Sequence, residues 1–474
     1  MKLVVSQSIA ILPWIFGIFL LYMIMPKYFR INRGFTCLII GSALLAGYCG
    51  LAAQIWLLDQ LNFNAISSFL LVTTGIVFLV FLIAKSFFKE TSIEIAENTT
   101  EYLYSPIFVL TLTLSLVVIG FTVHEHFLWP AVAWDTVWFW AVEANKFLLH
   151  IDSTEDITPF TTYGPHPKTL IYIMAWGGWS ASIADPLRFA PLIPWLHLYL
   201  AIAISLFGFF LNKTKSLAIS IVFTYIFLSA PLVEAHAIIA GYAELWIAFP
   251  IFLSIIFFCE FNKIKDNNLL FLALVTAVIP AFIKGVGSIY SISLFAIFLF
   301  TLVVNKWRGP SIFCFFGLLF LLTFSLHIVN IDFAAFGERF TINSSARLIA
   351  IGGREMFFAA NEWSTVFYNL YVALFVKNSF GILFSIAAVS YMYLTFLLIF
   401  RKKIELFPQV GLFTLMSSII IAALRHTDYF FNYSHPGNDT SLSRVCVILF
   451  LLGFTIIASA IDELSKMEKS DSQN

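Results

Sequence analysis

The sequence predicts an all-α integral membrane protein with about 13 transmembrane helices. Of its 474 residues, 60% are hydrophobic and 11% are charged, whereas a soluble domain is roughly 45–50% apolar and about 25% charged. Apolar runs long enough to cross a bilayer, about 20 residues each, recur along the chain. The 27 basic and 27 acidic residues cancel, so no net positive charge attracts nucleic acid. Composition therefore excludes a soluble enzyme, a nucleic-acid-binding protein and a disordered chain.

The orientation of the helices follows from Lys and Arg, which concentrate in short cytoplasmic loops. The first apolar run, at about residues 8–25, precedes Lys27, Arg30 and Arg33, which places that loop inside. The run has no small-residue cleavage site, so we interpret it as a retained helix rather than a signal peptide. The same alternation predicts further spans at about residues 35–58, 66–87, 104–123, 189–211, 216–234, 245–259, 267–283, 286–305, 311–329, 379–400, 409–424 and 443–461.

The spans divide the chain into three regions. Residues 1–103 form N-terminal transmembrane helices, residues 104–305 form a core with a long outer loop at 124–188, and residues 306–474 form a C-terminal transmembrane region with a second outer loop at 330–378. Long loops at this density of spans are usually functional. We therefore expect recognition or chemistry on the non-cytoplasmic side.

Three segments of these outer loops are predicted to be helices lying in the membrane interface. Residues 137–150 carry charged side chains on one helical stripe, and residues 170–182 are too short to span comfortably. The third, residues 356–376, would reverse the orientation of the next helix if it crossed the membrane. Arg401 and the two lysines after it would then lie outside, against the positive-inside rule.

Asp135, directly after Trp134 and a few residues beyond the fourth span, is the candidate general base. A poorly solvated carboxylate at the mouth of the membrane has a raised pKa, which suits proton abstraction. Asp is also a favoured N-cap, so Asp135 equally fits a cap of the helix that begins near Thr136. The two roles are compatible.

Four further residues are candidates for binding a substrate on the outer side. Two prolines flank His166, and Lys168 follows directly. The alternative to a binding role is that this segment is a simple turn before a helix. Tyr242 and Glu244 lie between two spans. A carboxylate at the start of a spanning helix is costly unless it faces a cavity or a partner.

Three cations complete the candidate set. Lys284 lies in a tight outer hairpin, and Arg444 precedes the last span. Arginine binds phosphate in a bidentate manner, whereas a lysine at a helix end commonly extends to the interface. Arg354, after two glycines, is a weaker candidate of the same kind.

The sequence offers little evidence for a metal site or disulfides. His124, Glu125 and His126 alternate along a helix and therefore point apart. All five cysteines fall in apolar runs without CxxC spacing, which is typical of small core residues.

Taken in order, these motifs resemble the GT-C superfamily of membrane glycosyltransferases, which includes the protein O-mannosyltransferases and the lipid A aminoarabinose transferases. The motifs are Trp134–Asp135, the Pro-rich turn Tyr163–Lys168, the step Gly241–Glu244, the Lys284–Gly285 hairpin and the late Arg444. The chain departs from the family in having one acid at position 135 instead of a pair, a glutamate instead of aspartate at position 244, and about three spans before the core. Whether the protein uses a divalent metal ion as a cofactor therefore stays open. The subfamily that the chain resembles also stays open.

The resemblance implies a GT-C-like fold and an inverting glycosyl transfer. A polyprenyl-phosphate-linked sugar would bind with its phosphate near Lys284 and Arg444, and Asp135 would deprotonate the acceptor, which is a lipid, a glycan or a protein. No nucleic acid takes part, and the expected location is a bacterial inner membrane with the active site facing outward.

Three alternatives remain, of which one is a non-catalytic scaffold of a membrane complex. A flippase or transporter of a lipid-linked glycan would place charges near the bilayer midplane and show internal repeats, whereas most candidate charges here lie at span ends. A glycan polymerase or ligase would share the donor but not require Asp135.

The predicted orientation can be tested at Thr162, in the first outer loop. In a background without the five native cysteines, a Thr162→Cys variant should react with a membrane-impermeant maleimide added to intact cells. Labelling only after permeabilisation would contradict the orientation, and with it the location of the candidate site.

Overall fold

A computed structural model of the chain describes two compact units, which we treat separately. One unit holds the described residues up to Ala243 and the other holds those from Glu244 onward. The described residues are 9–25, 33–60, 105–128, 140–141, 143–144, 147, 168–182, 193–239, 241–325, 331–335, 338–343, 348–351, 354–357, 361–376, 380–426 and 441–471.

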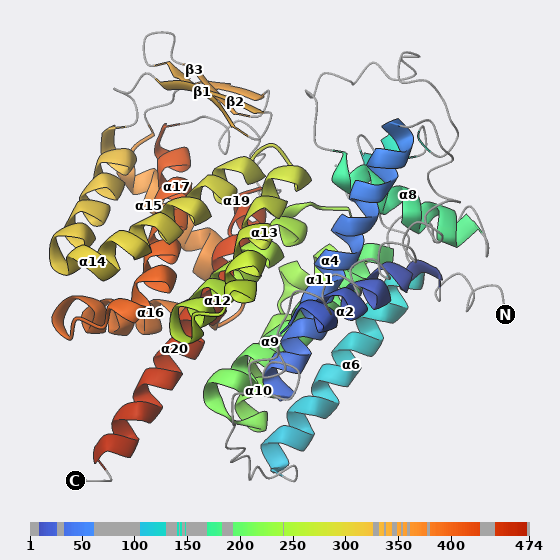
Figure 1. Cartoon of the computed structure of the whole chain (residues 1–474), viewed down its shortest axis with the longest axis horizontal. Helices are drawn as coiled ribbons and strands as arrows, with labels where there is room; N and C mark the ends of the chain where they lie inside the picture. Colours follow the sequence, from blue (N-terminus) through green and yellow to red (C-terminus); the bar gives the residue numbers. More distant parts are fainter. Residues whose placement is uncertain are drawn as a thin grey trace. The chain divides into compact units, whose positions relative to one another are not determined.

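The first unit is a bundle of helices in which α4 packs along both α2 and α9 (Figure 1). Helix α10 packs between α9 and α6, and α8 packs on α4. The helices of this unit are α2 (Leu12–Ile24), α4 (Arg33–Gln60), α6 (Pro106–Leu128), α8 (Thr169–Ser182), α9 (Ile193–Thr214), α10 (Leu217–Leu228) and α11 (Pro231–Ile238).

The second unit has α12, α13, α14, α17 and α20 packed around one another, with α16 on α20. Its helices are α12 (Glu244–Ile264), α13 (Asn267–Ile283), α14 (Gly287–Ser325), α15 (Trp363–Tyr371), the π-helix η3 (Val372–Val376), α16 (Leu383–Phe400), the 3₁₀-helix η4 (Ile404–Leu406), α17 (Phe407–His426), α19 (Ser441–Val445) and α20 (Val447–Asp471). Its strands are β1 (Ile331–Ala335), β2 (Glu338–Asn343), β3 (Leu348–Ile351) and β4 (Arg354–Phe357).

Eight helices in the described residues are long and apolar enough to cross a membrane, or nine if one bent pair counts as a span. The chain is therefore a multi-pass integral membrane protein. Two predicted spans, α2 and α13, are shorter helices of 13 and 17 residues, and the predicted span at 66–87 lies outside the described residues. The total of about 13 stays a prediction.

The predicted span at 216–234 is not one straight helix. The chain breaks between α10 and α11 and bends by 63°. Pro231 begins α11, where proline fits because the first helical residue needs no N–H partner. The predicted single crossing is thus a bent pair.

The two spans predicted at 286–305 and 311–329 are joined in the structure. Helix α14 runs for 39 residues from Gly287 to Ser325, so residues 306–310 continue the helix instead of forming the expected loop. At about 1.5 Å per residue, a helix of this length far exceeds the bilayer core.

The second outer loop contains a sheet that hydropathy did not predict. The strands form an antiparallel meander in the order β1-β2-β3-β4, with Ile331 opposite Ile342 and Ile351 opposite Arg354. The interfacial helix expected at 356–376 accordingly begins only at Trp363, and residues 356–357 belong to β4. Short strands in a loop lack the long apolar periodicity that a helix prediction uses.

The remainder of that segment, α15 with η3, is an apolar helix shorter than the candidate spans. At its start, the Asn361 side-chain amide donates to the Leu424 carbonyl oxygen at 2.7 Å, in the last turn of α17. At its end, η3 contacts α19, which precedes α20. The end of α17 and the start of α20 are predicted on the same side, and the interfacial location of this segment stays a prediction.

The other two predicted interfacial helices have different outcomes. Residues 137–150 lie largely outside the described residues. Helix α8 covers 170–182 as predicted, but Trp176 and the residues from Leu170 to Ala175 are buried. The segment is therefore packed inside its unit, and its location in the membrane interface stays a prediction.

Three helices end in an unusual way, with a lysine in the left-handed region of backbone space. Lys215, Lys265 and Lys402 have φ of 55°, 60° and 54°, at the ends of α9, α12 and α16. Left-handed residues commonly end helices, although glycine is the usual one. A lysine there places its charge beside the negative end of the helix dipole, and each falls in a loop predicted to be cytoplasmic.

Glycine determines the close approach of α2 and α4. A Cβ atom at Gly47 would overlap the Pro13 carbonyl group, and one at Gly17 would overlap the Ala43 carbonyl group. Small residues let membrane helices approach closely, because packing rather than the hydrophobic effect drives their association.

Gly47→Ala should lower the melting temperature of the detergent-purified protein, since forcing the helices apart costs about 1–3 kcal/mol. The matched control is Gly50→Ala in the same helix, where a Cβ would meet nothing within 4 Å. An equal effect of both substitutions would show that the α2–α4 contact does not carry the stability.

Candidate functional site

Three predicted site residues meet in the second unit, and we call Glu244, Lys284 and Arg444 the ion cluster. Glu244 Oε1 lies 3.6 Å from Lys284 Nζ and 3.9 Å from Arg444 Nη1. The side chains are 11%, 18% and 16% exposed, respectively. Sequence position alone suggested each residue separately, and the fold brings them to one place.

Local structure places Glu244 and Lys284 at helix ends. Glu244 is the first residue of α12, where a carboxylate interacts favourably with the positive end of the helix dipole. Lys284 ends α13, and a tight turn follows in which the Gly287 N–H donates to the Lys284 carbonyl oxygen at 2.7 Å. The turn requires glycine at 287, because a Cβ there would overlap the Pro280 carbonyl group.

Arg444 reaches the cluster from α19, and a buried hydroxyl lies next to it in the chain. The Ser443 side chain is 3% exposed, and its Oγ has no hydrogen-bond partner in the described residues. The Oγ of Ser288, one turn after Lys284, is likewise buried without a partner there. Buried polar groups normally have partners, so these hydroxyls are available to donate to a ligand.

The ion cluster places two cations beside one carboxylate. Both cation–oxygen distances from Glu244 exceed a normal hydrogen bond. The carboxylate therefore draws Lys284 and Arg444 to one place. Two cations brought together at the end of membrane helices suit an anion such as a phosphodiester.

An apolar cavity of about 220 Å³ lies in the same unit as the ion cluster. Leu374 and Phe375 of η3 line one part of it, and η3 contacts α19, which carries Arg444. Tyr391 of α16 and Phe413 of α17 line it farther along those spans. The cavity thus extends from the interfacial helix toward the interior of the membrane segment.

The structure does not describe where the remaining predicted site residues lie relative to this cluster. Asp135 and His166 lie outside the described residues. Arg354 is the first residue of β4, and its side chain is outside the described part of the structure. Lys168 and Tyr242 belong to the first unit, where Lys168 is exposed before α8 and the Tyr242 carbonyl oxygen accepts from Trp195 Nε1 at 2.8 Å.

No group of three metal-ligating side chains that could hold an ion occurs among the described residues. His126 is buried with Nδ1 2.8 Å from the Ala237 carbonyl oxygen, whereas the neighbouring His124 side chain is 63% exposed. Because Asp135 lies outside the described residues, metal binding at that residue stays untested.

Sequence reasoning missed the group that holds α15 in place. The Arg425 guanidinium donates to the Asn361 carbonyl oxygen and lies over the Trp363 ring at 5.2 Å. The signal was weak, since one arginine at the end of a span usually marks only the interface. The contact fixes the start of the helix that lines the apolar cavity.

The sequence matches no known protein-family model, and no curated protein or solved structure is significantly similar to it.

Glu244→Gln should lower the melting temperature at low salt, because it leaves two partly buried cations without their carboxylate. Added inorganic phosphate should then raise the melting temperature of the variant more than that of the native protein, since the anion replaces the missing charge.

The matched control is Glu260→Gln in the same helix. Glu260 is also buried, and its Oε1 lies 3.4 Å from the more exposed Lys263. It should be destabilising without any gain in the response to phosphate. Equal phosphate responses of the two variants would contradict an anion site at the ion cluster.

Proposed function

We propose that the chain is a membrane glycosyltransferase that moves a sugar from a polyprenyl-phosphate donor to a lipid, glycan or protein acceptor. The observation that carries the proposal is the ion cluster, in which Lys284 and Arg444 face a single carboxylate oxygen of Glu244. Two cations at one place suit the negative charge of a phosphodiester between lipid and sugar.

The surroundings of the cluster favour a lipid-linked phosphate over a soluble one. The cluster lies where the spans α12 and α20 begin, at the depth of lipid phosphates. The apolar cavity beside η3 offers a place for part of the isoprenoid chain. Lipid and phosphate would then be held by neighbouring parts of the same unit.

In the proposed reaction, the acceptor hydroxyl oxygen attacks the anomeric carbon of the sugar. The bond between that carbon and the phosphate oxygen breaks, and the polyprenyl phosphate leaves with the electron pair. Asp135 takes the hydroxyl proton, and Lys284 and Arg444 stabilise the negative charge that develops on the phosphate. A single displacement inverts the anomeric centre.

The other predicted residues take supporting roles in this proposal. His166, Lys168, Tyr242 and Arg354 would contact sugar, acceptor or phosphate from the outer loops and span ends. The site would face away from the cytoplasm in a bacterial inner membrane, because the loops that carry these residues are predicted on that side.

Turnover in detergent micelles tests the proposal against a flippase. Membrane extracts of cells that lack the protein should accumulate its polyprenyl-phosphate sugar, and this isolated lipid should donate its sugar to the acceptor when the purified protein is added in detergent. Micelles have no two sides, so a flippase would give no product there.

Asp135→Asn should abolish this turnover while leaving the membrane level of the protein unchanged, since an amide cannot accept the proton. Asp152→Asn, a change of the same kind in the same outer loop, should retain activity. Near-normal turnover of the Asp135 variant would remove that residue from the mechanism. Full activity without Lys284 and Arg444 would overturn the phosphate assignment.

A further inference from the structure

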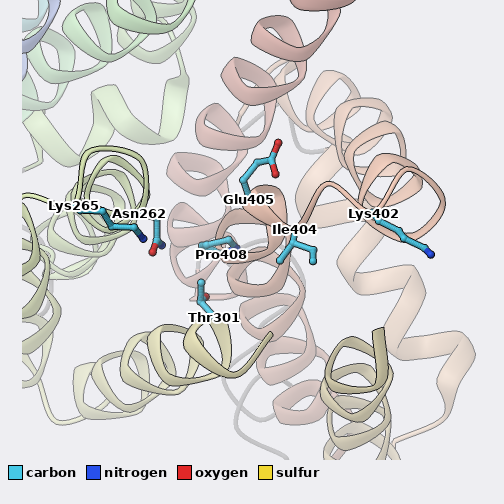
Figure 2. A pocket seen from close by; sticks show the side chains of 7 residues that line it. All are labelled: Asn262, Lys265, Thr301, Lys402, Ile404, Glu405 and Pro408. Carbon is cyan, nitrogen blue, oxygen red and sulfur yellow. The ribbon is translucent and has the colours of Figure 1, made fainter. Parts of the chain in front are cut away.

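A second hollow lies at the opposite end of the spans from the ion cluster, and we call it the headgroup pocket. It has a volume of about 520 Å³. Its lining comes from the end of α12, from α14, and from the segment that leads through η4 into α17 (Figure 2). The lining residues are Asn262, Lys265, Thr301, Lys402, Ile404, Glu405 and Pro408.

The depth of this pocket is set by three spans at once. The spans that contain α12 and the first part of α14 end at Ile264 and Val304, and the span that contains η4 and α17 begins at Ile404. Each of these span ends is at most a few residues along the chain from a residue that lines the pocket. The pocket therefore lies at the level of the lipid headgroups, whichever way the protein is oriented.

The chemistry of the pocket is mixed rather than simply basic. Figure 2 shows Asn262 and Lys265 close together on one side, Glu405 on the central segment, and Lys402 extending away from the others. Among the described residues, neither Lys265 nor Glu405 forms an ion pair, whereas the nearby Lys263 and Lys403 pair with Glu260 and Glu463. A cation and an anion thus line the same hollow without neutralising each other.

Asn262 gives an independent indication of a ligand. Both the nitrogen and the oxygen of its side-chain amide are buried without a hydrogen-bond partner in the described part of the chain. A buried amide with no partner is costly, and a phosphate oxygen would accept from its nitrogen.

We propose that the headgroup pocket binds a phosphoethanolamine group, in which a phosphate and a primary ammonium are linked by two carbons. The phosphate lies against Lys265 and Asn262, and the ammonium lies against Glu405. Lys402 adds positive charge at the rim. This assignment is independent of the glycosyl transfer proposed above and concerns the other end of the unit.

Native mass spectrometry of the detergent-purified protein can compare three lipids that share their acyl chains. Phosphatidylethanolamine should bind about tenfold more tightly than phosphatidylcholine, whose ammonium carries no N–H donor, and than phosphatidylglycerol, which has no ammonium. Binding of phosphatidylcholine or of phosphatidylglycerol as tightly as phosphatidylethanolamine would overturn the proposal.

Variants then separate the two halves of the headgroup. Lys265→Asn, which keeps a residue that tolerates left-handed φ, and Glu405→Gln should each weaken phosphatidylethanolamine binding about tenfold. The matched control is Lys215→Asn, because Lys215 also ends a helix with left-handed φ but does not line this pocket. Unchanged melting temperatures would show that the variants are folded, and unchanged binding by both would contradict the proposal.

Soluble phosphoethanolamine identifies the source of the group. Displacement of the lipid by an equal concentration of soluble phosphoethanolamine would assign the pocket to the free monoester. Retention of the lipid would assign it to a membrane lipid. Both results support the chemistry, whereas binding of neither compound would overturn it.

Discussion

The cost of placing charge in a bilayer determines where this chain keeps its ionisable side chains. Only 11% of its residues are charged, and several of those in the second unit pair at the beginnings and ends of its candidate spans. At one level Glu244 faces Lys284 and Arg444, and at the other Glu463 pairs with Lys403 and Lys466. Pairing at span ends lets the helices between remain apolar.

The two levels differ in how closely their charged groups approach. Glu463 meets Lys466 at 2.9 Å and also pairs with Lys403, which anchors the end of α20 to the loop after α16. In the ion cluster, Glu244 lies 3.6 Å from Lys284 and 3.9 Å from Arg444. A structural anchor needs close pairing, whereas an anion site needs cations gathered at one place.

Hydropathy predicted many of the long apolar helices, because the length of chain that crosses a bilayer is visible in the composition of each segment. The positive-inside rule placed the start of α12, the end of α13 and the start of α20 on one side, and Glu244, Lys284 and Arg444 indeed meet. They missed the bend at Pro231, the continuous α14 and the four strands. These features depend on local packing and short-range pairing, which leave little trace in apolar periodicity. The headgroup pocket is lined by three segments that are distant in sequence, so no local sequence pattern predicted it.

The most direct test of the account is an experimental structure of the protein with a polyprenyl phosphate bound. We expect phosphate density within hydrogen-bonding distance of both Lys284 and Arg444, with the isoprenoid chain entering the apolar cavity beside η3. A phosphate bound elsewhere, with the Glu244 cluster unchanged, would contradict it.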